Sequence, residues 1–185
     1  MNPEPKEISD NVESDGQTVK LRLRYPYLAE ETKAAKRINA YISRVFSAIC
    51  KAAKKSRRYS FFSCGFSAYT SADGYFSVFF ELTAKGKDKA YSYSPFSFTF
   101  DKNGFAVPLY TKLPKDAFKK AKREFSARGI TLTEKEFLYS YYLTPCGAVI
   151  YAVRKRASGR HGYIEYEYKA ELKEPEKLLG SSNAP

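Results

Sequence analysis

The stretch that decides the fold is Tyr91-Ser92-Tyr93-Ser94-Pro95-Phe96-Ser97-Phe98-Thr99-Phe100, in which aromatic rings alternate with small polar residues. A period of two is typical of a β-strand with one face on an apolar core and the other toward water. The rings change from odd to even positions at Pro95, which also lacks a backbone N–H. We therefore expect a β-bulge or an edge strand at this proline.

Similar alternation on both sides of this stretch predicts further strands, at 19–25, 59–70, 75–84, 105–109, 137–144, 148–153 and 164–172. Pro26 is expected to end the first of these strands, and Asp73-Gly74 indicates a two-residue hairpin turn. Residues 30–56 and 114–129 carry apolar residues at the helical period instead. The pattern predicts an α+β domain, in which an antiparallel meandering sheet packs on one long N-terminal helix and a second helix lies in a connection.

Length and composition favour one globular domain with tails. The chain has 185 residues, 43% of them hydrophobic, and holds no run of about 18 apolar residues of the kind that spans a bilayer. Residues 1–16 are acidic and lack periodicity, which predicts a disordered arm. We expect a single domain over 17–172 and a flexible tail over 173–185.

The charge of the chain predicts an anionic partner. The formal net charge is +12, and because residues 1–16 carry −4, residues 17–185 carry +16. A basic surface of this size attracts nucleic acid, anionic lipid, cell-wall polymers or acidic protein surfaces. Charge alone gives the sign of the partner and leaves its class open.

The residues that carry catalysis are sparse in this chain. His161 is the one histidine, the three cysteines are far apart, and neither GxxxxGK[ST] nor GxGxxG occurs. Glu165, Glu167 and Glu171 alternate along one predicted strand, which is the pattern of a solvated face. We therefore predict a non-enzymatic protein without a metal or cofactor.

The strongest candidates for partner contacts are a basic loop and a basic turn, each between two predicted strands. Their residues are Arg154, Lys155, Arg156, Arg160 and His161 in the loop, and Lys85, Lys87 and Lys89 in the turn. Basic residues beside aromatic strands also suit RNA, although the ribonucleoprotein motif is absent. The alternatives to an anion-binding module are thus an RNA-binding protein and a structural module without a ligand.

Several short motifs resemble one known family. Leu23-Arg24-Tyr25-Pro26-Tyr27-Leu28, followed by Ala35-Lys36-Arg37-Ile38-Asn39-Ala40-Tyr41-Ile42, resembles the opening of RsiV-like domains. Phe98-Thr99-Phe100-Asp101-Lys102-Asn103-Gly104 with Val107-Pro108-Leu109 is similar to a hairpin of that family, and residues 137–151 are similar to its late hairpin. RsiV-like domains occur in lysozyme-sensing anti-sigma factors and beside peptidoglycan deacetylase domains.

The resemblance implies a non-catalytic recognition module, often of the cell envelope. The family's Gly-Gly-Ala-His segment is replaced here by Lys85-Gly86-Lys87-Asp88-Lys89, so its role is not carried over. A basic lysozyme is not expected as a partner, because two basic surfaces repel each other. The start of the chain has no secretory signal pattern and indicates the cytoplasm, whereas the family points to the envelope.

Overall fold

Two β-sheets and two helices make up the part of the chain that the computed structural model describes: residues 3–14, 17–71, 73–86, 90–108, 116–131, 133–134, 140–145, 147–152 and 167–170. The larger sheet has the order β1-β2-β3-β4-β5 and the smaller one β6-β7-β8. The strands and helices, in chain order, are β1 (Pro3–Ser14), β2 (Gln17–Leu28), α1 (Lys33–Lys54), β3 (Phe61–Thr70), β4 (Phe76–Lys85), β5 (Tyr91–Phe100), α2 (Ala117–Ser126), β6 (Tyr141–Thr144), β7 (Gly147–Tyr151) and β8 (Glu167–Ala170).

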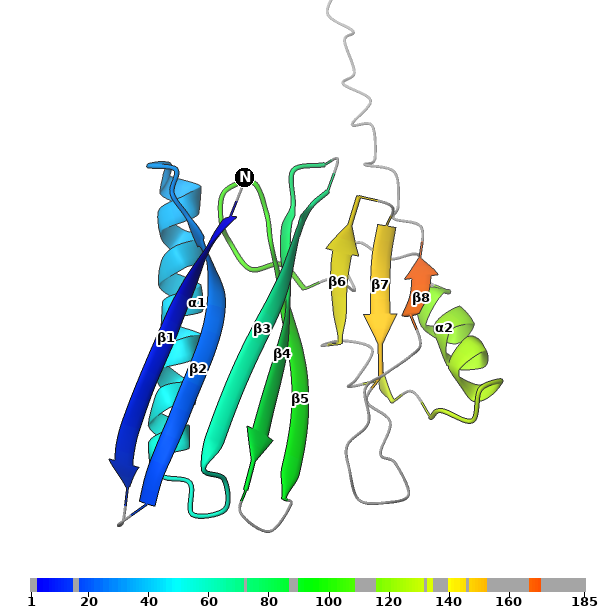
Figure 1. Ribbon diagram of the computed structural model, residues 1–185. Helices are drawn as coiled ribbons and strands as arrows, with labels where there is room; N and C mark the ends of the chain where they lie inside the picture. The colour runs from blue at the N-terminus through cyan, green and yellow to red at the C-terminus, as the bar shows by residue number, and fades with distance from the viewer. Residues whose placement is uncertain are drawn as a thin grey trace, which may run out of the picture.

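The elements stack as helix, sheet, sheet and helix, with α1 and α2 on the outside (Figure 1). The alternation along β4 explains this arrangement. Phe76, Val78 and Phe80 belong to the core beneath α1, whereas Phe79, on the opposite face, packs against Tyr142 and the rest of the smaller sheet. Because both faces are apolar in the first half of β4, that part of the larger sheet is covered on both sides.

The long helix α1 follows from its apolar stripe and its ends. Ile38, Ile42 and Phe46 are buried along one face, as the helical period predicts. The Thr32 hydroxyl caps the N-terminus by accepting a hydrogen bond of 3.1 Å from the backbone N–H of Ala35. Lys51 and Lys54 in the last turn complement the helix dipole.

The smaller sheet is a two-sided layer. Tyr142, Val149 and Tyr151 of β6 and β7 face the larger sheet, while Leu143 and Ile150 pack with Phe125 of α2. Ser77 of β4 ties the two sheets together, since its hydroxyl accepts a hydrogen bond of 2.9 Å from the backbone N–H of Leu143. The smaller sheet therefore lies over one end of the larger sheet.

The fold class is α+β, as the sequence predicts, with a mostly antiparallel five-stranded sheet. The single meandering sheet needs correction, because the strands divide into two sheets and β2 runs parallel to β3. The helix α1 connects those two strands, and a parallel pair requires a long crossover of this kind. The predicted two-residue hairpin is also longer, since β3 and β4 are separated by residues 71–75, with Gly74 at φ 79°.

The predicted disordered arm is wrong over residues 3–14, which form β1 and pair with β2 along its whole length. The prediction that Pro26 ends the first strand is wrong as well. Pro26 lies opposite Pro5 in the ladder, at a pair where neither residue needs to donate to the other strand. The predicted tail over 173–185 lies outside the described residues.

The aromatic strand β5 is an edge strand of the larger sheet, as expected from Pro95. The alternative of a bulge does not apply, because β4 and β5 keep one register from Phe76 opposite Phe100 to Lys85 opposite Tyr91. Phe96, Phe98 and the other even-numbered rings therefore face α1, and Tyr93 faces the other side. Among the described helices, none is long and apolar enough to cross a membrane.

Candidate functional site

At one end of the larger sheet, no other described element covers the face opposite α1, and this surface carries the most distinctive group of polar and aromatic side chains. We call this surface the open face. Its residues, from β2 to β5, are Lys20, Arg22, Phe61, Ser63, Gly65, Thr83, Lys85 and Tyr91. Strand register places them together, because residues paired across neighbouring strands point to the same side of a sheet.

The first row of the open face alternates cations and rings across four strands. Lys20 of β2 pairs with Phe61 of β3, Phe61 pairs with Lys85 of β4, and Lys85 pairs with Tyr91 of β5. The two lysines are exposed, and the two rings are half-buried. Neighbouring strands lie about 4.8 Å apart, so one bound molecule can contact a lysine ammonium group and the adjacent ring at the same time.

The second row is held by hydrogen bonds. Arg22 pairs in register with Ser63, and the Ser63 hydroxyl lies 2.8 Å from the Thr83 hydroxyl across the β3–β4 ladder. Arg22 also forms an exposed ion pair with Glu7 of β1, with Nε and Oε1 3.7 Å apart. This row therefore offers one guanidinium and two hydroxyls beside the lysines of the first row.

Gly65 leaves a vacant position on this face. A Cβ atom built on Gly65 would meet no atom within 4 Å, and the residue has no positive φ that would demand glycine. A glycine inside a strand often marks a place where another molecule approaches the backbone. The next position across the ladder is Glu81, whose Oε1 accepts a hydrogen bond of 3.2 Å from the Tyr93 hydroxyl.

Backbone hydrogen bonds fix the edge of the open face where basic residues gather. The Lys20 N–H donates to the Ser60 carbonyl and the Ser60 N–H donates to the Lys85 carbonyl, both at 2.9 Å. Gly86 lies against the backbone of Arg58, because a Cβ there would approach the Arg58 carbonyl oxygen to 2.3 Å. The end of α1, the start of β3 and the end of β4 are thereby brought together.

Of the residues predicted as partner contacts, the structure describes Lys85, which it places in the open face. Lys87 and Lys89, together with Arg154, Lys155, Arg156, Arg160 and His161, lie outside the described residues. Lys20 and Arg22 were not singled out by the sequence. The sequence does carry a signal for them, because the polar positions of the predicted strand 19–25 are all basic. The same pattern is equally typical of a strand face exposed to solvent.

The described residues hold no group of three or more His, Cys, Asp or Glu side chains close enough to bind a metal ion. Two cysteines are described. Burial raises the pKa of Cys64 to about 12, and burial also raises the pKa of Cys50, against the opposing effect of nearby Lys54. Both thiols are therefore held in the protonated form at neutral pH, where they are weak nucleophiles and metal ligands.

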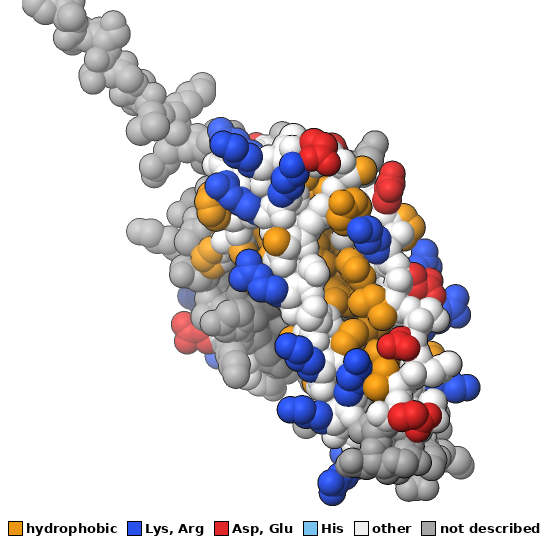
Figure 2. Space-filling model, turned by 90° about the vertical axis from the view of Figure 1, so that its left-hand side faces the viewer, with side chains coloured by type: hydrophobic (Ala, Val, Ile, Leu, Met, Phe, Trp, Pro, Cys, Tyr) orange, Lys and Arg blue, Asp and Glu red, His pale blue; other side chains and the backbone are white. Residues whose placement is uncertain are grey.

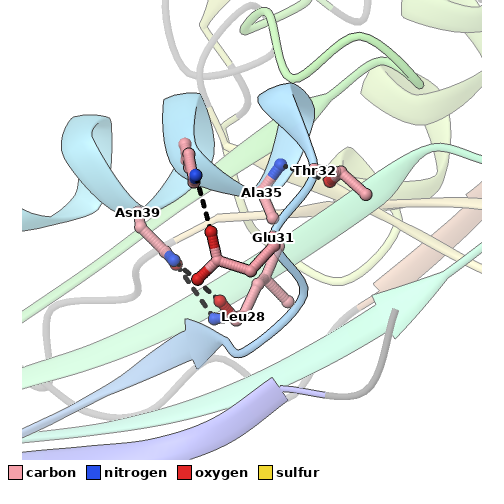
Figure 3. Close-up of polar contacts among 6 residues, drawn as sticks. Leu28, Glu31, Thr32, Ala35 and Asn39 are labelled. Atoms are coloured by element: carbon pink, nitrogen blue, oxygen red, sulfur yellow. Dashed lines mark hydrogen bonds and ion pairs between the residues drawn. The ribbon is translucent and has the colours of Figure 1, made fainter.

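A polar clamp fixes the strand β2 to the helix that follows it (Figure 3). The Asn39 Oδ1 accepts a hydrogen bond of 2.9 Å from the Leu28 N–H, and the Asn39 Nδ2 donates one of 2.8 Å to the Leu28 carbonyl. Glu31 and Lys36 form an exposed ion pair of 2.6 Å at the same corner. The Ile-Asn motif of the sequence thus has a structural role, which sets the position of β2 under α1.

The turn after β5 docks on the other side of the same helix. The Asp101 carboxylate accepts hydrogen bonds of 2.9 Å from the backbone N–H groups of Asn103 and Phe105. Gly104 has φ 81°, and a Cβ there would lie 2.4 Å from the carbonyl oxygen of Ala34 in α1. Glycine is therefore required at this position for two reasons, its backbone conformation and the close approach of the helix.

Comparison with solved structures finds DUF3298 proteins, which form the RsiV-like domain family. A member from Bacteroides fragilis is 10% identical, and the match covers 82% of this chain and 83% of that chain with a TM-score of 0.42. A DUF3298 protein from Pseudomonas aeruginosa is 12% identical, with coverage of 87% and 86% and a TM-score of 0.48. No family model and no curated protein matches the chain.

Proposed function

We propose that this chain is a non-catalytic recognition domain that binds an anionic macromolecule on its open face. The observation that carries the proposal is the row Lys20, Phe61, Lys85 and Tyr91, in which cations and rings alternate on one surface. Lysines attract and neutralise anionic groups, and half-buried rings give a flat apolar surface beside them. The partners we propose are an acidic protein or an anionic cell-wall polymer.

We further propose that the chain is a divergent RsiV-like domain. The motifs that resemble this family have defined places in the fold, and this supports the proposal. The Ile-Asn motif supplies the Asn39 clamp on Leu28, and the motif after Phe100 forms the turn in which Gly104 contacts α1. Two short motifs from distant parts of the chain therefore both shape the surroundings of α1.

The experiment that tests the open face compares two triple variants with the same loss of charge. The first, Lys20→Ser, Arg22→Ser and Lys85→Ser, removes three cations from the open face. The control, Lys33→Ser, Arg44→Ser and Lys51→Ser, removes three exposed cations from α1. Binding to a fluorescent poly(glycerol phosphate) wall polymer and to an acidic polypeptide is measured at physiological salt.

The proposal predicts that the first variant loses at least tenfold in affinity for one of the two probes and that the control stays within about twofold of the unmodified chain. Equal losses in both variants would show that net charge, and not this surface, attracts polyanions. Absence of binding by the unmodified chain to both probes would contradict the proposal for these partner classes. Thermal melting of all three proteins shows that the comparison is made between folded chains.

The same row of cations and rings favours single-stranded RNA as a second candidate. Bases can stack on sheet aromatics while lysines contact phosphates. RNA binding would weaken steeply with salt, because each neutralised phosphate releases counterions. A labelled RNA that binds through the open face at physiological salt, while the wall polymer and the acidic polypeptide do not, would replace the first proposal by this one.

A further inference from the structure

The strand β1 forms one edge of the larger sheet, and within the described residues its outer side carries no neighbouring strand. Figure 2 looks from the side of α1 and β1 and shows a strip of hydrophobic side chains running along the molecule. Lys and Arg are numerous on one side of the strip, and acidic side chains occur along the other. Ile8 and Val12 of β1 are half-buried and pack against the core beneath α1.

The prolines indicate which backbone groups of β1 point outward. Pro5 and Pro26 are directly opposite in the β1–β2 ladder, so this must be a pair without hydrogen bonds between the two strands. Hydrogen-bonded and non-hydrogen-bonded pairs alternate, and odd-numbered residues of β1 therefore direct their N–H and C=O groups away from β2. Glu7, Ser9 and Asn11 offer complete donor and acceptor pairs at this edge.

We infer that a second copy of this chain adds to the sheet at this edge, through antiparallel pairing of β1 with the β1 of its partner about a two-fold axis at Ile8. In this register Glu7 exchanges backbone hydrogen bonds with Ser9 of the other copy, and Asn11 lies opposite Pro5. This register agrees with the directions of the backbone groups in β1. The N–H and C=O groups of Ile8 point toward β2, so Ile8 lies opposite Ile8 of the other copy at a pair without hydrogen bonds between the copies. A two-fold axis makes each of these contacts twice.

Charge favours this register, since an axis at the neighbouring Ser9 brings no like charges together but lacks the attraction between Lys6 and Asp10. With Ile8 on the axis, Lys6 lies opposite Asp10 of the other copy twice, and Glu4 lies opposite Val12. An axis at Glu7 would place Glu7 against itself and Glu4 against Asp10. An axis at Asp10 would place Asp10 against itself and Glu7 against Glu13, so both shifts bring like charges together, which destabilises cross-strand pairs.

The axis stands perpendicular to the sheet and leaves both faces of the joined sheet as they are in one copy. The two apolar strips meet on the α1 side, where Ile8 and Val12 of each copy become more deeply buried. The two open faces lie on the other side and point in the same direction. If the proposed function holds, one polymer could engage both, but the pairing itself does not rest on that function.

A charge-exchange experiment tests the register. Lys6→Glu places Glu against Asp10, and Asp10→Lys places Lys against Lys6, so each variant alone should dimerise at least tenfold more weakly than the unmodified chain. Mixed in equal amounts, the two variants place opposite charges at both positions and should recover heterodimers. Sedimentation velocity with one variant labelled measures all three cases over a range of concentrations.

A backbone variant tests the edge itself. Ser9→Pro removes one outward N–H and leaves the β1–β2 ladder intact, so it should abolish the dimer, whereas Ser9→Ala should not. An unmodified chain that stays monomeric at 100 μM, or a mixture that dimerises no better than its components, would overturn the inference. A Ser9→Pro chain that melts like Ser9→Ala yet still dimerises would show that the copies meet elsewhere.

Discussion

At the scale of single residues, a few polar contacts position the elements around α1. Asn39 satisfies both backbone groups of Leu28, and Gly104 lets the turn after β5 approach the start of the helix. Neither residue contributes apolar surface to the core. Their role is to fix where β2 and the turn after β5 lie relative to α1.

The Asn39 clamp gives the first prediction. Asn39→Ala leaves the N–H and C=O of Leu28 without their partners, and we expect a loss of about 1–3 kcal/mol in the free energy of unfolding. Urea denaturation measures it, with Ser43→Ala, at an exposed position of the same helix, as the control. A loss of less than about 0.5 kcal/mol for Asn39→Ala would mean that water replaces the clamp at no cost.

The buried thiol of Cys64 gives the second prediction. Its pKa rises from 9.0 to about 12 on folding, so between these values the unfolded chain has released a proton that the folded chain retains. Stability therefore falls as pH rises through this window and is unaffected by this group below it. At pH 10.5 the loss due to Cys64 is at most about 2 kcal/mol.

Urea denaturation of the unmodified chain and of Cys64→Ala, at pH 8 and at pH 10.5, isolates this effect. Other groups titrate equally in both proteins, so their contributions cancel in the comparison. The unmodified chain should lose more stability than the variant over this interval. Equal losses would show that the thiol is accessible to water in the folded chain.

At the scale of elements, β1 is a strand that its side-chain pattern does not predict. Its twelve residues include two prolines and four acids, and its apolar residues Ile8 and Val12 do not alternate as in β5. The strand exists because its backbone pairs with β2 and because those two side chains cover the edge of the core. The aromatic strands, in contrast, could be predicted because both their faces carry the alternation.

The strand β1 gives the third prediction. A chain that begins at Gln17 should unfold at a lower temperature, because the burial of Ile8 and Val12 and the ladder with β2 are lost. At about 1 kcal/mol for each half-buried side chain, the midpoint should fall by roughly 4–8 °C. Differential scanning calorimetry measures the shift. An unchanged midpoint would show that β1 adds no stability, as expected of a disordered arm.

The candidate site could be predicted from the sequence only in part. Lys85 was identified from the charge of its turn, but Lys20 and Arg22 join it through the parallel pairing of β2 with β3. That pairing depends on the crossover through α1 and brings together residues about sixty positions apart. No local pattern contains this information, since basic residues on alternate positions of a strand are equally typical of a solvated face.

At the scale of the whole molecule, the two ends of the larger sheet differ on the side opposite α1, and we propose that only one of them binds a partner. The smaller sheet covers one end of the larger sheet with Tyr142 and Tyr151, whose rings lie 5.1 and 5.0 Å from that of Phe79. The other end presents the open face on a chain with a net charge of +12. Charge brings a polyanion to any part of such a molecule, so the claim that needs testing is the place where it binds.

The most direct test fills the vacant position on the open face without changing any charge. Gly65→Leu places a side chain beside Ser63 and Thr83 where a Cβ meets no other atom, so the fold should be retained. Isothermal titration with the polyanion that binds the unmodified chain should show at least a tenfold loss of affinity at an unchanged melting temperature. An unchanged affinity would contradict the account and place the partner on another surface.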